Sequence, residues 1–347
     1  MEEKLLDQAA TEEKDYILEV EGMKQYFPIA TNFLGKPLAY LRAVDGVSFK
    51  LERGRTLGVV GESGCGKTTL GRTILRLYDV TEGSAKYTTF DDKGEKVTHD
   101  LAKISRKEFY NLRTELQLVF QDPYSSLPPR MTVGAIIGEA VRVHKIVPES
   151  EIGSYVRGVM ARCGLQPHHY DRYPHEFSGG QRQRICIARA LAVKPKLVIC
   201  DEPVSALDVS IQAQIINLLK KLQREEGMSY IFISHDLSVV KYISDDIAVM
   251  YLGNIVEMGT AHEICTNPKH PYTQALFSAV PVANPHAKSE PVALEGEFPS
   301  PANPPSGCKF HTRCRYCTDK CREAAPVMKD IGSGHFVTCH LCSENEQ

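Results

Sequence analysis

The chain of 347 residues lacks three features that would direct it into a membrane, out of the cell or onto nucleic acid. No uninterrupted apolar run approaches the ~18 residues that a membrane-spanning helix needs. Residues 1–15 are acidic and polar, without the apolar segment of a secretory signal. The formal net charge is only -2, so no overall basic field attracts nucleic acid. We therefore expect a protein that is made in the cytosol and stays there, where it can sit against a membrane protein.

Cysteines are sparse in most of the chain and crowded at its end. Hydrophobic residues make up 42% and charged residues 24%, which is ordinary for a globular protein with a sizeable core. In a reducing cytosol, clustered cysteines favour metal binding or redox chemistry over structural disulfides, and six of the 11 lie within residues 308–347. The other five are expected to be small buried hydrophobic residues: Cys65, Cys163, Cys186, Cys200 and Cys265.

Short apolar runs alternate with helical stretches through most of the chain. Continuous apolar runs of five residues suit strands that are buried on both faces. Residues 210–227 have helical periodicity and end at Gly227, a favourable C-cap. This alternation predicts an α/β fold with a largely parallel sheet. The expected strands are 57–61, 116–120, 197–201, 230–234 and 247–251.

The remaining regions divide the chain. We expect one α/β domain over residues 16–280, preceded by a polar tail at 1–15. Residues from about 130 to 192 contain no convincing strand, which predicts a helical subdomain inserted into that domain. Residues 281–305 carry seven prolines in 25 residues and predict an extended linker. The cysteine-rich residues 306–347 then form a small separate module.

A phosphate-binding loop is predicted between the first expected strand and a helix that opens at Lys67. Residues 61–68 read GESGCGKT, a match to GxxxxGK[ST]. Glycines let successive backbone N–H groups point at phosphate oxygens, and the helix N-terminus adds its positive dipole end. Lys67 is expected to reach the β- and γ-phosphates and Thr68 to ligate magnesium. The expected nucleotide contacts are Gly61, Glu62, Ser63, Gly64, Cys65, Gly66, Lys67, Thr68 and Thr69.

Two adjacent carboxylates end another buried strand. Residues 196–203 read KLVICDEP, in which the apolar residues bury the strand and its tip delivers Asp201 and Glu202. Asp201 is expected to hold magnesium, directly or through water. Glu202 is expected to act as the general base that polarises the attacking water.

Further motifs around the phosphate-binding loop and the acidic strand end make the chain resemble the ATP-binding-cassette (ABC) ATPase family. Gln121 in VFQDPYSSL matches the Q-loop, Asp208 in SALD the D-loop, and His235 in ISHD the switch histidine. The signature motif is matched by Ser178, Gly179, Gly180 and Gln181. The resemblance implies ATP and Mg²⁺ as cofactors and catalytic roles for Glu202, His235 and Gln121. It also implies that Gln121 contacts both nucleotide and magnesium, and that the signature and Asp208 contact nucleotide.

In this family two ATPases face each other, and each signature caps the γ-phosphate that its partner holds. The resemblance therefore implies that the chain is half of an ATP-driven dimer. An aromatic platform for adenine is expected upstream of the phosphate loop. The spacing favours Phe27 over Tyr26, with ordinary strand packing of Phe27 as the alternative.

Several stretches resemble the ATPase subunits of bacterial dipeptide and oligopeptide importers, and the F-type subunit more than its D-type partner. They include AVDGVSF (43–49), HPYTQALFSAVP (270–281) and the tail GCKFHTRC, and the resemblance covers nearly the whole chain. It implies a complex with a second ATPase, two membrane permeases and an external peptide-binding protein, at the cytoplasmic face of the membrane. ATPases of nickel, glutathione or haem importers remain open, as does a nucleotide-gated ABC protein outside transport.

The sequence matches other classes of nucleotide-binding protein less well. A DNA-repair or chromosome ATPase would insert a long coiled coil between Lys67 and Ser178, which are only 111 positions apart and enclose no heptad repeat. A translation factor of this superfamily would carry two cassettes, and a small GTPase would carry an [NT]KxD motif, which we do not find. A non-enzymatic scaffold would not need to retain Glu202 and His235.

Spacing leaves two ligand sets open in the cysteine-rich tail. A zinc ribbon would pair Cys314-x2-Cys317 with Cys339-x2-Cys342. The resemblance to importer ATPases instead implies a [4Fe-4S] cluster on a different set of four cysteines, and it favours this cluster over zinc. Unligated thiols are the third alternative. The iron–sulfur ligands would be Cys308, Cys314, Cys321 and Cys339.

Overall fold

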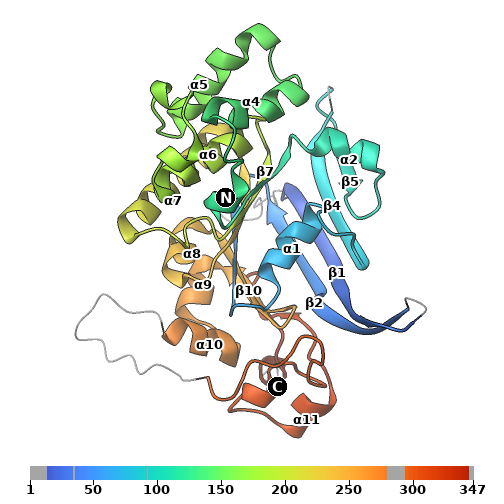
Figure 1. Ribbon diagram of the computed structural model, residues 1–347. Helices are drawn as coiled ribbons and strands as arrows, with labels where there is room; N and C mark the ends of the chain where they lie inside the picture. The colour runs from blue at the N-terminus through green and yellow to red at the C-terminus, as the bar shows by residue number, and fades with distance from the viewer. Residues whose placement is uncertain (1–13, 34–35, 92, 280–293, 344–347) are drawn as a thin grey trace, which may run out of the picture.

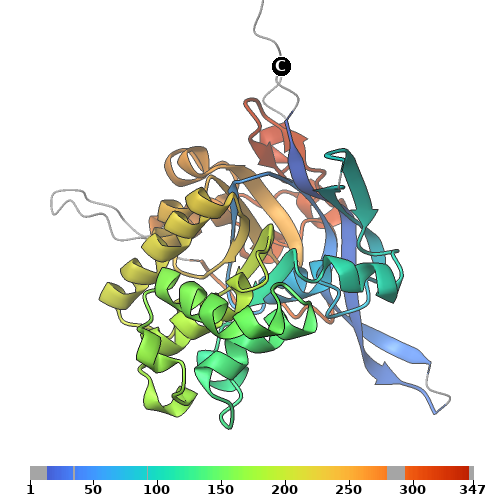
Figure 2. The same ribbon diagram turned by 90° about the horizontal axis from the view of Figure 1, so that it is seen from above.

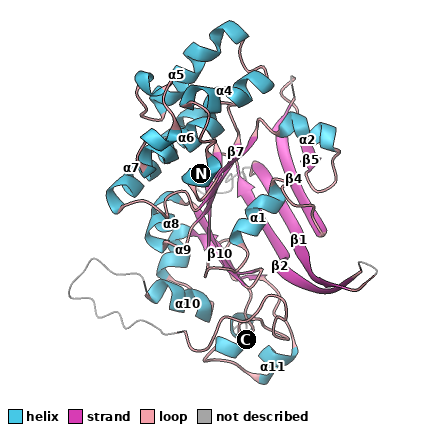
Figure 3. Cartoon of the chain, viewed as in Figure 1, coloured by secondary structure: helices cyan, strands magenta, loops and turns pink. Residues whose placement is uncertain are grey.

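Two sheets of different construction form the core of the computed structural model, which describes residues 14–33, 36–91, 93–279 and 294–343 (Figures 1 and 3). A four-stranded antiparallel sheet has the order β2-β1-β4-β5, and an eight-stranded sheet has the order β11-β12-β10-β9-β3-β8-β7-β6. The strands are β1 (Tyr16–Thr31), β2 (Pro37–Glu52), β3 (Thr56–Val60), β4 (Glu82–Phe90), β5 (Lys96–Asp100), β6 (Leu116–Val119), β7 (Leu197–Asp201), β8 (Ser229–Ile233), β9 (Asp246–Tyr251), β10 (Asn254–Thr260), β11 (Lys329–Asp330) and β12 (Phe336–Val337).

The helices pack on and around these sheets. They are α1 (Lys67–Ile74), α2 (Arg106–Leu112), α3 (Pro123–Ser126), α4 (Val133–Val143), α5 (Ile152–Arg162), α6 (Gly179–Leu191), α7 (Val209–Glu226), α8 (Leu237–Ile243), α9 (Ala261–Thr266), α10 (Pro271–Ser278) and α11 (Asp319–Glu323). None of the helices in the described ranges combines the length and apolarity that crossing a bilayer requires.

The predicted parallel sheet is confirmed at the centre of the larger sheet. Strands β9, β3, β8, β7 and β6 pair in parallel, and these five are the five expected from sequence. Their side chains alternate between two apolar layers. In β7, Leu197 and Ile199 join one layer, whereas Val198 and Cys200 join the other. Burial on both faces explains why these strands read as uninterrupted apolar runs.

The two layers place different elements on the two faces of the parallel strands. On one face, Leu70 and Ile74 of α1 pack with Val20 of β1, so α1 lies between the two sheets (Figure 1). On the other face, α7 contributes Ile215 and Leu219. The antiparallel sheet was not predicted; it covers α1 and completes a layered α/β fold.

Helix α7 ends at the predicted C-cap and begins at a cap that the sequence analysis did not name. Asp208 accepts a hydrogen bond from the Ile211 N–H at 3.0 Å and caps its first turn. Gly227 has a φ of 66° and forms a left-handed C-cap.

The stretch between β6 and β7, all of which the structure describes, contains no strand. It carries α3 to α6, which gather on one side of the molecule in the view from above (Figure 2). Residues 294–343 lie at the opposite end, beside α10 (Figure 1). They join the larger sheet because β12 pairs with β10, with Val337 opposite Glu257. Residues 1–13 and 280–293, which include most of the predicted tail and part of the predicted linker, lie outside the described residues.

Candidate functional site

The phosphate-binding loop connects β3 to α1 as predicted, with backbone that only glycine tolerates at two positions. Gly66 caps α1 with a φ of 105°, and a Cβ there would lie 2.0 Å from the Ala43 carbonyl oxygen. A Cβ on Gly61 would lie 2.2 Å from the Met250 carbonyl oxygen. The loop is therefore wound tightly against β2 and β9, which keeps its amides at the helix N-terminus.

Lys67 is the first residue of α1 and turns back into the loop. Its side chain is buried, and its ammonium donates to the Gly61 carbonyl at 2.7 Å and to the Glu62 carbonyl at 3.0 Å. A phosphate bound by the loop amides would meet this charge. The geometry agrees with the role predicted for Lys67.

Thr68 and Asp201 supply two oxygens suited to a hard divalent cation. The Thr68 hydroxyl donates to Asp201 Oδ1 at 2.7 Å. Asp201 Oδ2 is buried and has no hydrogen-bond partner among the described residues, although the Arg72 guanidinium lies 3.6 Å away. Burial raises the pKa of the Asp201 carboxyl above its ordinary value, partly offset by the hydrogen bond from Thr68. A buried carboxylate beside a hydroxyl fits Mg²⁺, which prefers oxygen ligands.

The ends of three neighbouring parallel strands converge on Glu202. Gln121 follows β6, Glu202 follows β7 and His235 follows β8. Gln121 Nε2 donates to Glu202 Oε2 at 2.7 Å, and His235 Nδ1 lies 3.3 Å from Glu202 Oε1. Glu202 has a φ of 45°, held by its N–H bond to the Ile233 carbonyl at 2.9 Å. Backbone of this kind is typical of functional sites, where surrounding contacts hold a strained residue.

A cavity of about 230 Å³ brings eight of the predicted residues together. Gln121 and Glu202 line it together with residues of the phosphate loop. Three lining residues were missed from sequence: Leu41, Ala43 and Pro301. Ala43 stands in a stretch that the resemblance had marked, but no local pattern in the sequence marks Pro301. The loop residues that line the cavity are Ser63, Gly64, Gly66, Lys67, Thr68 and Thr69.

Phe27 does not line this cavity. Its ring packs edge-on against Tyr78, with ring centroids 5.1 Å apart. Across the antiparallel sheet it pairs with Leu41, which does line the cavity. The role of Phe27 as an adenine platform therefore stays a prediction. Leu41, and not Phe27, lines the cavity beside the phosphate loop.

The signature residues form a capped helix start on the surface. The Ser178 hydroxyl accepts from the Gln181 N–H at 3.4 Å, and the Gln181 side-chain oxygen accepts from the Ser178 N–H at 3.1 Å. Ser178 is exposed, and no signature residue lines the cavity. Asp208 is also exposed; hydrogen bonds from Ser210 and the Ile211 N–H lower its pKa.

The five single cysteines agree with the prediction of small apolar residues, since four are buried and Cys265 is half-buried. Among the described residues, however, no group of three or more His, Cys, Asp or Glu side chains is placed to hold a metal ion. This finding supports neither the zinc ribbon nor the iron–sulfur set. Burial, followed by the charges of Cys321, Cys339 and Cys314, raises the pKa of the Cys308 thiol to about 11. A hydrogen bond with Cys342 lowers the pKa of Cys339 to about 6.

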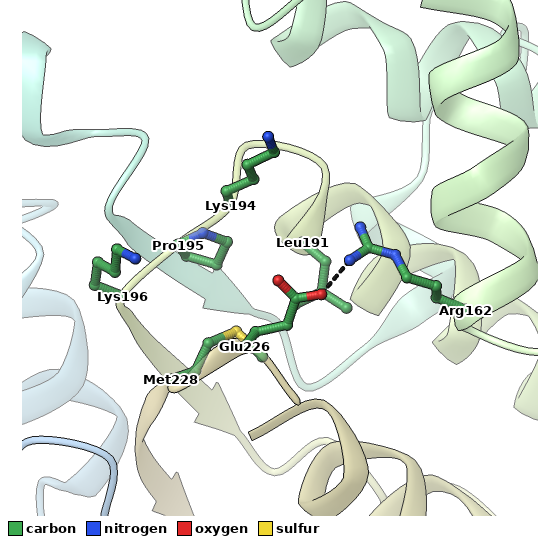
Figure 4. A pocket seen from close by; sticks show the side chains of 7 residues that line it. All are labelled: Arg162, Leu191, Lys194, Pro195, Lys196, Glu226 and Met228. Carbon is green, nitrogen blue, oxygen red and sulfur yellow. Dashed lines mark hydrogen bonds and ion pairs between the residues drawn. The ribbon is translucent and has the colours of Figure 1, made fainter. Parts of the chain in front are cut away.

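A second cavity, of about 100 Å³, lies at the other end of β7 (Figure 4). Lys196 immediately precedes that strand, whereas Asp201 and Glu202 end it, so the cavity opens at the edge of the sheet away from the phosphate loop. An ion pair between Arg162 and Glu226 crosses it. None of the predicted site residues lines this cavity. Its lining consists of Arg162, Leu191, Lys194, Pro195, Lys196, Glu226 and Met228.

Two family models match the chain. The one described as ABC transporter matches residues 44–205, and the one described as oligopeptide/dipeptide transporter, C-terminal region, matches residues 256–321. The first range holds the phosphate loop, Gln121, the signature and Glu202, and the second holds four of the six tail cysteines.

Curated relatives are similar over almost their whole length. The oligopeptide transport ATP-binding protein AppF of Bacillus subtilis (strain 168) is 52% identical, over 95% of this chain and 98% of its own. OppF of Salmonella typhimurium is 49% identical over 95% and 98% of the two chains. The dipeptide transport ATP-binding protein DppF of Escherichia coli (strain K12) is 48% identical over 95% and 96%.

Solved structures share the fold. CbiO1 of Clostridium perfringens, described as part of the ABC transporter complex cbiONQ, superposes with a TM-score of 0.59 at 28% identity and covers 73% of this chain and 92% of its own. The dimeric ATP-binding cassette MJ0796, bound to ADP and Pi, gives a TM-score of 0.60 at 23% identity over 70% and 98%. With the geometry above, these similarities show that the chain belongs to the family of ABC transporter ATPases that carry the oligopeptide/dipeptide transporter C-terminal region.

Proposed function

We propose that this chain is the ATP-hydrolysing subunit of an importer for oligopeptides or dipeptides. The observation that carries the proposal is the position of Glu202, which lies between Gln121 and His235 on the rim of the cavity that holds Lys67 and Thr68. The names of the relatives support the substrate class, because AppF, OppF and DppF are described as oligopeptide or dipeptide transport proteins.

Each side chain of the site has a separate task in hydrolysis. The loop amides and Lys67 bind the phosphates, and Thr68, Asp201 and Gln121 hold Mg²⁺, which neutralises phosphate charge when it is bound. Glu202 accepts the proton of the attacking water. His235 and Gln121 touch opposite oxygens of Glu202 and orient its carboxylate toward the γ-phosphate.

A second ATPase completes the site. The signature, Ser178 to Gln181, and Asp208 lie outside the lining of the chain's own cavity, and Ser178 and Asp208 are exposed, where a facing cassette can reach them. We propose a heterodimer that binds two ATP molecules between its subunits and opens after hydrolysis. The dimeric form in which the cassette MJ0796 was solved supports this arrangement.

Transport requires membrane partners. We propose two permease subunits, fed by an external peptide-binding protein, with this chain bound peripherally at the cytoplasmic face. The helices between β6 and β7 would form the inserted subdomain, at about residues 130–192 of a domain spanning 16–280. Gln121 lies between β6 and this subdomain and donates to Glu202, so it can pass nucleotide state to the permeases.

We further propose that the module at 306–347, which follows the linker at 281–305, holds a [4Fe-4S] cluster on Cys308, Cys314, Cys321 and Cys339. The Cys308 N–H donates to the Cys321 carbonyl at 2.8 Å, which places these two cysteines next to each other. In this account the cluster is structural and takes no part in hydrolysis. When bound, it would tie the tail segments to one another.

The function is tested on the complex purified from membranes after affinity capture of this chain. Two permeases and a second ATPase should co-purify, and the reconstituted complex should hydrolyse ATP faster when loaded binding protein and peptide are added. Stimulation by a nickel complex, glutathione or haem, with no response to peptides, would overturn the peptide assignment. Failure to recover permeases would overturn the transport role.

A further inference from the structure

Glu62 in the phosphate loop is engaged by Lys67 of the same loop and by two residues from distant parts of the chain, Tyr272 and Arg313. Its N–H donates to the Tyr272 hydroxyl at 2.9 Å, and its carbonyl accepts from Lys67 at 3.0 Å. Its carboxylate accepts from the Arg313 guanidinium at 2.9 and 3.2 Å. Arg313 lies 251 positions later, in the C-terminal segment. This one loop residue therefore links the C-terminal segment to the lysine expected to bind phosphate.

The ion pair between Arg313 and Glu62 is largely shielded from water. The Arg313 side chain is 7% exposed and that of Glu62 is 29% exposed. The guanidinium also lies over the Tyr251 ring, 6.0 Å from its centroid. Partial burial strengthens the attraction relative to a surface pair, and it makes loss of one partner costly because the other charge remains.

An aromatic cluster fixes the segment that carries Arg313. Phe310, which is 2% exposed, packs against Tyr251 and Tyr272 with ring centroids 5.2 and 5.5 Å away. Phe298 packs on Tyr251 from the start of the same segment, at 5.3 Å. Because Tyr272 also binds the Glu62 N–H, the cluster and the ion pair hold Glu62 from two directions.

The same segment also contacts residues on and next to β2, which supplies Leu41 and Ala43 to the lining of the nucleotide cavity. The Lys309 ammonium donates to Asp45 at 2.7 Å and to the Leu252 carbonyl at 3.0 Å. The Pro301 carbonyl accepts from the Arg42 N–H at 3.1 Å, and Pro301 itself lines the cavity. Residues 298–313 thus form part of the nucleotide site's wall and support its loop.

We propose that Arg313 is a positioning residue for nucleotide binding, which holds Glu62 in place and neutralises its carboxylate beside the triphosphate. The inference rests on the proposed function, in that the loop binds ATP. An unpaired carboxylate in the phosphate loop would disfavour a bound triphosphate, because like charges repel each other. With Arg313 in place, the loop presents Lys67 and its amides without that opposing charge.

The test measures equilibrium binding of a fluorescent ATP analogue, and of ATP by competition, to the full chain. Arg313→Met should raise the Kd for ATP about tenfold, within the usual range of coupling between linked sites. In the assembled complex the KM for ATP should rise similarly, with kcat at saturation changed less than about twofold.

Arg315→Met is the matched control, because Arg315 is exposed and stacks only on Tyr316 in the described structure. Its Kd should equal that of the wild type.

A second variant separates charge neutralisation from simple packing. In a Glu62→Gln background no carboxylate is left to repel phosphate, so Arg313→Met should change the Kd less than about twofold. Arg313→Lys, which keeps the charge, should stay within about threefold of the wild type and serves if Arg313→Met does not fold. An unchanged Kd for Arg313→Met, or an equal loss in the Glu62→Gln background, would overturn the inference. Absence of ATP binding by the wild type would instead overturn the proposed function.

Discussion

Glu202 is the residue on which the chemistry of the site converges. It takes a φ of 45°, accepts from Gln121 and contacts His235, so its carboxylate is fixed from the backbone and from both neighbouring strands. A general base works best when its position is set before the substrate arrives. The strained backbone is maintained because β7 and β8 hold the residue in this conformation.

Replacing the proposed base and the phosphate-binding lysine should impair the protein in different ways. Glu202→Gln keeps the size and the hydrogen-bonding ability of the side chain but cannot take a proton. In the assembled complex it should bind ATP and stay closed while hydrolysis falls about 10²–10⁴-fold. Lys67→Ala removes the charge that meets the phosphates and should mainly raise the Kd for ATP.

The matched control is Glu225→Gln, because Glu225 is exposed at the end of α7 and pairs only with Lys221 among the described residues. It should hydrolyse ATP at the wild-type rate. Near wild-type turnover by Glu202→Gln in the complex would show that another group is the base.

The buried Asp201 carboxylate should lower the stability of the fold while it serves as a magnesium ligand. Burial raises its folded-state pKa above the unfolded value, so the ionised carboxylate destabilises the fold at neutral pH, and this penalty fades as pH falls. Asp201→Asn keeps an oxygen for the Thr68 hydroxyl and removes the charge. Without nucleotide the variant should melt at or above the wild-type temperature, with a smaller pH dependence between about pH 4 and 7.

Addition of Mg²⁺ and ATP should then raise the melting temperature of the wild type but raise that of Asp201→Asn much less. Thermal unfolding with and without Mg²⁺ measures both effects. A variant that melts well below the wild type at every pH, or that keeps the full magnesium effect, would contradict the role given to Asp201.

At the scale of elements, the parallel strands could be predicted from sequence and the antiparallel sheet could not. Runs such as residues 197–201 are buried on both faces and leave a continuous apolar signal. Strand β2 alternates buried and exposed residues over part of its 16 positions, and several register shifts interrupt its pairing with β1. This partial alternation was too weak to predict an antiparallel sheet from sequence.

The residues of the site also fall into two groups, those that the sequence predicted and those that it did not. Residues that follow a parallel strand or open its helix, such as Gln121, Lys67 and Glu202, stand next to a recognisable pattern. Pro301 and Arg313 reach the cavity and its loop through contacts spanning more than 200 positions, which no periodicity records. Long-range contacts of this kind are visible only in the folded chain.

The tail cysteines offer a test of the proposed cluster. Protein purified without oxygen should contain about four irons per chain and absorb broadly near ~400 nm. Cys321→Ser removes a proposed ligand and should abolish both signals, whereas Cys342→Ser, outside the proposed set, should keep them. One equivalent of zinc, lost in Cys342→Ser, would assign the site to a ribbon, and colourless, metal-free wild-type protein would show that the thiols are unligated.

At the scale of the whole molecule, the proposed function treats the chain as two incomplete halves of an ATP site. The phosphate loop, Asp201 and Glu202 line or border one cavity, while the signature caps a separate surface helix and does not line that cavity. Hydrolysis in this account needs a facing cassette to supply the missing half. The central claim is therefore that the protein works only when it is assembled.

The most direct measurement of that claim is ATP hydrolysis as a function of assembly. Dilute isolated chain should turn over slowly, and the rate per chain should rise as the partner ATPase and the permeases are added, by the law of mass action. Ser178→Arg, which blocks the signature without touching the chain's own cavity, should lower that gain. Full hydrolysis by the dilute monomer, independent of concentration and of partners, would contradict the account.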